Sequence, residues 1–81
     1  MDLAHGRVKL IEVTLASDSP PVTQGLTLDD LRLPDAVTVV SVVRGDRPMV
    51  PTDTMRFQEH DHVILMSRED ATQDAAAAFI A

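Results

Sequence analysis

The sequence predicts an α+β fold: a small sheet or pseudo-barrel, with a short helix after the first strand and a C-terminal helix packed on the sheet. The first observation is a valine-rich segment, residues 37–44, whose branched Cβ atoms suit a pleated strand. The second is strand-like patterning in residues 7–16 and 62–67. The third is an alanine-rich segment, residues 69–80, with an apolar stripe at helical spacing.

The composition limits the class of protein and its partners. We expect residues 1–81 to be one domain and a piece of a longer polypeptide, because strand-forming residues begin almost at once. The chain has no cysteine, tryptophan or tyrosine, and Phe57 and Phe79 are its only aromatic residues, so we expect a largely aliphatic core. Chains this short often gain further burial by dimerising. A net charge of −6 disfavours nucleic acid and anionic membrane surfaces as partners. No apolar run is long enough to span a bilayer, and we expect a cytoplasmic protein.

The first strand is predicted over residues 7–16, after a lead-in of residues 1–6. Apolar and polar side chains alternate along it, as in a strand with one face in water. The apolar face carries Ile11, Val13 and Leu15.

A loop and a short helix are predicted next. Residues 17–25 contain two consecutive prolines and are interpreted as a loop. Residues 27–33 are interpreted as a helix, with Thr27 as the N-cap and Asp30 at the capping-box position three residues later. Pro34 would end this helix.

The valine-rich segment is predicted to be the central strand. A regular alternation places Val37, Val39 and Val43 on one face, and Val40 and Val42 on the other. A strand that is apolar on both faces is usually covered on both faces, so we expect the remaining chain or a partner to enclose it.

The rest of the chain is predicted from its turn signals and its periodicity. The elements are a hairpin turn at Gly45-Asp46, a short edge strand at Met49–Val50, a connection over 51–61, a last strand over 62–67 and a helix over 69–80. Pro48 marks the returning strand as an edge strand, because proline cannot donate to the ladder. The apolar stripe of the last helix consists of Ala71, Ala75, Ala78 and Phe79.

These anchors, in this order, resemble the RCK C-terminal domain, also called the TrkA-C domain, over about residues 8–79. The pattern consists of Gly25-Leu26-Thr27-Leu28-Asp29-Asp30-Leu31, Leu33-Pro34, the valine strand ending in Arg44-Gly45, Pro51, Asp53-Thr54 and Asp61. One departure is His60-Asp61, where the family usually has Gly-Asp before the last strand.

The resemblance implies a β-X-β-β-X-β-α fold that forms a symmetric homodimer. Domains of this family follow a nucleotide-binding lobe in regulators of potassium channels and transporters, or form cytoplasmic appendages of cation–proton antiporters. They are not enzymes, and some bind cyclic di-AMP in a cleft at the dimer interface. We therefore expect a ligand-sensing dimerisation domain that acts on a membrane-embedded cation channel or transporter, directly or through a preceding lobe. The alternative is a constitutive dimerisation module without a small-molecule ligand.

The resemblance also directs attention to a ligand cleft. By position, the cleft would be lined by Leu31 and Arg32 at the end of the predicted helix and by Val50 and Pro51 after the edge strand, and Arg44 and Arg47 could supply positive charge. The alternative is that these residues pack a dimer interface or lie in solvent. The negative net charge and the lack of a stacking aromatic favour that alternative.

The other motifs have simpler explanations. His60 and His62, with Glu59, could hold a divalent ion or sense pH, but a turn in which Asp61 caps backbone donors also explains them, and we expect no metal site. Arg44-Gly45-Asp46 spells the integrin tripeptide, which a hairpin turn explains. No nucleophile signature or convergent carboxylate pair is present, so the sequence does not predict catalysis.

Overall fold

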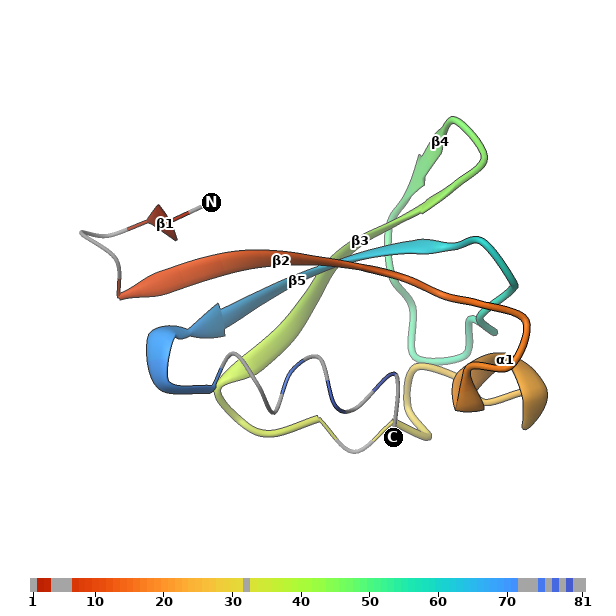
Figure 1. Cartoon of the computed structure of the whole chain (residues 1–81), viewed down its shortest axis with the longest axis horizontal. Coiled ribbons are helices and arrows are strands. Elements are labelled where there is room, and N and C mark those ends of the chain that lie inside the picture. Colours follow the sequence, from red (N-terminus) through yellow and green to blue (C-terminus); the bar gives the residue numbers. More distant parts are fainter. Residues whose placement is uncertain are drawn as a thin grey trace.

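A five-stranded antiparallel sheet organises the computed structural model, which describes residues 2–3, 7–31, 33–71, 75, 77 and 79 (Figure 1). The strands lie in the order β1-β2-β5-β3-β4. Their bounds are Asp2–Leu3 for β1, Val8–Thr14 for β2, Val37–Arg44 for β3, Arg47–Met49 for β4 and His62–Arg68 for β5. The described helical elements are α1, Pro20–Thr23, and the 3-10 helix η2, Glu69–Ala71.

The sheet agrees with the predicted strands except at its two edges and at its centre. The returning edge strand β4 covers Arg47–Met49 and includes Pro48, whereas the prediction placed it at Met49–Val50. The predicted lead-in contains β1, whose two residues pair with Lys9 and Val8. A two-residue strand is too short to give an alternation signal. The middle position belongs to β5, which pairs with both β2 and β3, so the valine strand is interior but not central.

A β-bulge in β3 overturns the predicted division of the valines between two faces. Val39 pairs with Leu65 but Ser41 pairs with Ile64, so Val40 is an extra residue on the bulged strand. Each bulge reverses the alternation that follows it. Val42 is therefore fully buried beside Val63, on the same face as Val37 and Val39, whereas Val40 remains 46% exposed.

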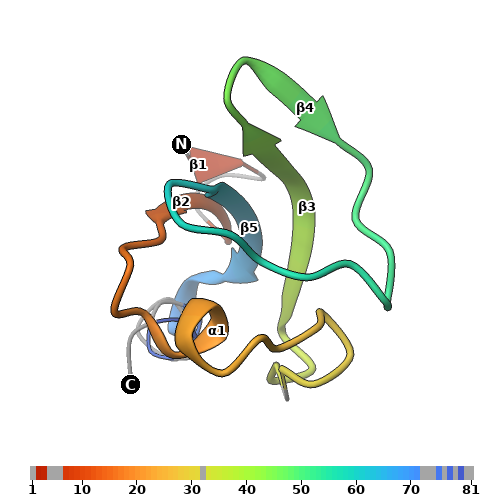
Figure 2. The ribbon, with the colours of Figure 1, turned by 90° about the vertical axis from the view of Figure 1, so that its right-hand side faces the viewer.

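The core lies on one face of the sheet. Leu15, Val42, Val63 and Leu65 are fully buried there, and Phe79 packs edge-to-face on Phe57 with a centroid distance of 5.7 Å. Figures 1 and 2 show α1 and the segment that leads into β3 on this side, while the β3–β4 hairpin points away from α1.

The helices differ from the prediction. The segment predicted as a loop contains α1, whose first two residues are prolines. Proline is tolerated there because the N–H groups of the first turn have no acceptor within the helix, so their absence removes no helical hydrogen bond. The helix predicted over 27–33 is wrong: residues 28–30 form a turn. The predicted cap contacts exist, since Thr27 N–H donates to Asp30 Oδ2 at 2.9 Å and Asp30 N–H donates to Thr27 Oγ1 at 3.3 Å. The segment before Pro34 is too short to extend beyond one turn.

The C-terminal segment is helical at residues 75, 77 and 79, after η2. Ala71, Ala75 and Phe79 are buried in the core, as the predicted stripe requires. Ala78 and residues 72–74, 76 and 80 lie outside the described residues.

The turn that enters β5 depends on an unusual backbone conformation at His60. Its φ is +71°, and its N–H donates to the Leu15 carbonyl at 2.8 Å. This left-handed conformation is energetically unfavourable for a residue that has a Cβ atom, whereas glycine adopts it without that cost. The position is therefore suited to the glycine that the family usually has there.

We expect His60→Gly to raise the free energy of unfolding by about 0.5–1 kcal/mol, because relief of the left-handed conformation exceeds the added unfolded-state entropy of glycine. The His60–Glu59 ion pair that it removes is on the surface and contributes little. Urea unfolding measures the change. Glu59→Gly, at a neighbouring position without a positive φ, should lower stability; equal effects of the two substitutions would contradict the interpretation.

Candidate functional site

A cleft of about 300 Å³ lies between the start of β3 and two loop segments. Leu28, Leu31 and Leu33 come from the turn after α1, and Pro51 and Asp53 come from the connection after β4. Val37, Thr38 and Val39 of β3, and Asp29 of the turn, complete the lining. A concave site with apolar side chains and a few polar groups is the usual form of a small-molecule site.

The two loop walls are joined to each other by backbone contacts. Leu28 N–H donates to the Met55 carbonyl and Asp29 N–H donates to the Asp53 carbonyl, each at 3.0 Å. Thr27 and Arg56 form an isolated bridge, and the Arg56 guanidinium donates to the Gly25 carbonyl. These hydrogen bonds attach the two walls of the cleft to each other.

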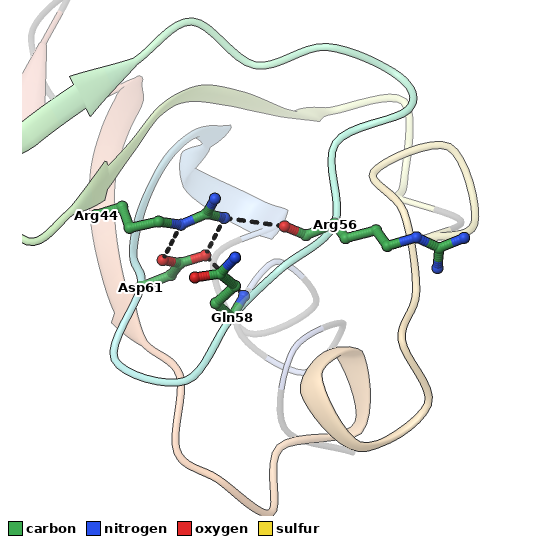
Figure 3. A network of polar contacts seen from close by, with 4 residues as sticks. All are labelled: Arg44, Arg56, Gln58 and Asp61. Atoms are coloured by element: carbon green, nitrogen blue, oxygen red, sulfur yellow. Dashed lines mark hydrogen bonds and ion pairs between the residues drawn. The ribbon is translucent and has the colours of Figure 1, made fainter.

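An ion pair fixes the far end of this connection to β3. Arg44 Nε and Nη2 each donate to a different oxygen of Asp61 at 2.9 Å, and Nη2 also donates to the Arg56 carbonyl at 2.9 Å (Figure 3). Gln58 N–H donates to Asp61 Oδ2 at 2.9 Å, and the Asp61 side chain is completely buried. The pKa of Arg44 is raised by its hydrogen bonds to Asp61, so the guanidinium stays charged.

The cleft has a negative rim. Asp29 and Asp53 both line it. Beside them, the pKa of Asp30 lies below its ordinary value, chiefly because the Thr27 backbone N–H, and then the Thr27 hydroxyl, bind its carboxylate. The Coulombic effect of Arg56 acts in the same direction.

The structure brings together only some of the residues predicted for a ligand site. Leu31 and Pro51 line the same cleft. Val50 precedes Pro51 but is 86% exposed, and Arg32 lies outside the described residues. Arg44 binds Asp61, and Asp46 of the integrin-like tripeptide is an exposed residue of the turn after β3. Arg47 is exposed on β4, outside the lining of the cleft.

The two histidines have different partners. His60 lies in the turn, where its Nε2 is 2.9 Å from Glu59 Oε1. His62 lies on β5, where its Nδ1 is 2.9 Å from Glu12 Oε1 and 3.0 Å from Thr14 Oγ1. Asp61 accepts a backbone hydrogen bond across the same turn, as the turn explanation requires. The described part of the chain holds no group of three metal-ligating side chains.

Several residues of the cleft were not found from the sequence. Leu28, Leu33 and Val39 line it, and their apolar character alone did not distinguish them from core residues. The pairing of Arg44 with Asp61, 17 positions apart, has no local signal either. Only the Leu31–Pro51 association followed from the order of the anchors.

The fold of this chain is similar to that of a solved RCK domain. A solved structure described as "Structure of RCK domain with cda" superposes with a TM-score of 0.64 over 90% of this chain and 97% of its own. The two sequences are 11% identical, so the likeness concerns the fold.

The chain belongs to the TrkA-C domain family, whose model matches residues 10–80. Two forms of the Trk system potassium uptake protein TrkA homolog 1 from Methanosarcina mazei are 26% identical to it over 76 residues. The matched region is 94% of this chain but 18% and 16% of those two proteins, respectively. Within the described residues, no helix is long and apolar enough to cross a membrane.

We expect Arg44→Met to lower the free energy of unfolding by about 3 kcal/mol, because it leaves the buried Asp61 carboxylate without its counter-charge. Chemical denaturation measures the loss. Arg47→Met is the matched control, since Arg47 is exposed on β4 and should change stability by less than about 0.5 kcal/mol. Equal losses in the two variants would show that the ion pair does not stabilise the fold.

The Thr27–Asp30 contact predicts a specific pH dependence. The folded-state pKa of Asp30 is below its ordinary value. The carboxylate therefore contributes fully to the free energy of unfolding above that ordinary value, and this contribution is lost as the pH falls through the folded-state pKa. Asp30→Ala should therefore be less stable than the wild type at pH 7, and the difference should shrink as the pH falls below the ordinary carboxyl value. Urea unfolding across this range measures it. A difference that is independent of pH would contradict a role for the carboxylate charge.

Proposed function

We propose that this domain is a cytoplasmic regulatory, ligand-sensing and dimerisation domain of a potassium or other cation transport system. The observation that carries the proposal is the cleft in which Leu31 and Pro51, from distant segments, meet over β3. Membership of the TrkA-C family, and relatives described as Trk system potassium uptake proteins, support the transport context. The partner is a membrane-embedded channel or transporter, reached directly or through a preceding nucleotide-binding lobe.

The mechanism is a shift between two arrangements of a homodimer. A ligand that binds one arrangement more tightly than the other increases its population, and a ligand with equal affinity for both changes nothing. The walls of the cleft are joined by backbone hydrogen bonds and attached to β3 through Arg44 and Asp61. Movement of these walls is therefore communicated to the sheet.

Cyclic di-AMP is the first ligand to consider, because the resemblance suggests it and the cleft contains Leu31 and Pro51 as apolar surfaces. A specific observation favours the alternative, a constitutive dimerisation module. Asp29 and Asp53 line the cleft, and Arg44 is occupied by Asp61, so the described residues favour an anion less than the sequence suggested.

Thermal unfolding with cyclic di-AMP, cyclic di-GMP and ATP separates the two functions. A ligand at about one hundred times its dissociation constant stabilises the native state by roughly 2.7 kcal/mol, which raises the melting temperature by several degrees in a domain of this size. Ligand sensing predicts a rise with cyclic di-AMP alone.

Two variants locate the binding. Leu31→Ala should reduce the rise with cyclic di-AMP, because Leu31 lines the cleft, whereas Val50→Ala, on the exposed residue before Pro51, should retain it. No rise with any of the three nucleotides, in a domain that is a dimer, would favour the constitutive module.

A further inference from the structure

The charged residues that line the ligand cleft, among those that the structure describes, are both acidic. Asp29 enters the cleft from the turn after α1, and Asp53 enters it from the connection after β4. No described residue of the lining is a lysine or an arginine. Neither carboxylate is paired with another described side chain. The charge of the cleft is therefore negative and is not neutralised from within the described lining.

The two aspartates lie side by side where the walls of the cleft are joined. Asp29 N–H donates to the Asp53 carbonyl at 3.0 Å, and both residues are exposed to solvent. Two carboxylates on hydrogen-bonded neighbours repel each other, and a positive charge bound between them relieves the repulsion. This end of the cleft is thus suited to a cationic group.

The described arginines of the neighbouring segments are bound to other groups or lie outside the cleft. Arg44 binds the buried Asp61 through both Nε and Nη2. Arg56 donates to the Gly25 carbonyl, and Arg47 is exposed on β4. A phosphate group in the cleft would therefore meet two carboxylates and, within the described lining, no counter-charge.

The rest of the lining is largely apolar and is held in place by the core. Its apolar side chains include Leu28, Leu31, Leu33 and Val39, which pack against the core cluster, and Val37, which belongs to that cluster. The volume of about 300 Å³ lies at the lower end of the range for small-molecule sites. A compact ligand with an apolar body gains free energy from burial on this surface.

The other large depression lacks this selection by charge. A hollow of about 470 Å³ lies beside Met66, on the outer face of the sheet, which is the face opposite the core. Its charged lining residues, Asp35 and Arg68, have opposite signs. Binding of an apolar molecule in this hollow therefore requires no particular ligand charge.

We propose that the cleft binds a small organic cation, with an ammonium group between Asp29 and Asp53 and an apolar body on the leucines and valines of the lining. The inference rests on the proposed ligand-sensing function, and it replaces the anionic dinucleotide that the resemblance suggests with an amine. An ammonium group at this position contacts both walls at once, so its binding favours the arrangement in which the walls are joined. The net charge of −6 also favours the approach of a cation.

Titration of the isotopically labelled chain with hexylamine, hexanol and hexanoate tests the ligand class. The three probes share an apolar body and differ in charge, and two-dimensional NMR measures both the affinity and the location of each. We expect hexylamine to bind with a dissociation constant of about 1 mM and to shift the amide signals of Leu28, Leu31 and Val39. Hexanol should bind at least about fivefold more weakly, and hexanoate at least about tenfold more weakly.

Removal of each carboxylate charge locates the ammonium group. Asp29→Asn and Asp53→Asn retain the size of the side chain and the backbone bond between the walls. Each should weaken the binding of hexylamine at least about fivefold and leave the binding of hexanol unchanged. Asp46→Asn is the matched control, because it removes one negative charge from an exposed turn outside the lining of the cleft. It should change the affinity for hexylamine by less than about twofold.

The outcomes separate the ligand class from the sensing function. Equal affinities for hexylamine and hexanoate, equal effects of Asp53→Asn and Asp46→Asn, or signal changes beside Met66 in place of the cleft would overturn the cationic site. Binding of cyclic di-AMP in the cleft without binding of hexylamine would overturn it and retain ligand sensing. If neither hexylamine nor a nucleotide changes the signals of the cleft, ligand sensing fails as well. The probe series on the wild type decides the ligand class even if a variant does not fold.

Discussion

The ion pair between Arg44 and Asp61 is the contact on which the arrangement of the loops depends. A completely buried carboxylate is costly unless its oxygens are hydrogen-bonded and its charge is neutralised. Arg44 supplies the charge and two hydrogen bonds, and the Gln58 N–H supplies a third. The same guanidinium binds the Arg56 carbonyl, so the connection after β4 is held against the end of β3. The wall of the cleft is a continuation of that connection.

The bulge at Val40 makes this ion pair possible. In an unbroken alternation Arg44 would share a face with Thr38, which lies on the outer side opposite Met66. The extra residue reverses the order, and both Val42 and Arg44 turn toward the side that holds the core and Asp61. One backbone irregularity thus explains two failures of the sequence interpretation. The valines were divided incorrectly between the faces, and Arg44 was expected to serve a ligand.

The sequence predicted elements whose signal is local and continuous. The three long strands have branched or alternating apolar residues, and the structure has strands at those places. The cap contacts of Thr27 and Asp30 were also predicted, but the described residues of the segment form only turns with i→i−3 or shorter hydrogen bonds before Pro34, and not a helix. The N–H groups of Leu28 and Asp29, which the first turn of a helix would leave without an intrahelical partner, bind a segment more than twenty residues away. Such tertiary hydrogen bonds leave no periodic pattern. Leu31 and Pro51 were associated through the order of the family anchors, whereas the acidic rim of Asp29 and Asp53 depends on how the two loops are joined.

The start of β3 borders two concave surfaces, the cleft and a hollow of about 470 Å³ beside Met66. Thr38 faces Met66 on the outer side, and it also lines the cleft with Val37 and Val39. A change in the cleft that rotates this part of the strand must alter the outer face, because a pleated strand is stiff across a few residues and the packed core resists local deformation. The cleft and the outer face of the sheet are therefore separated by the thickness of one strand.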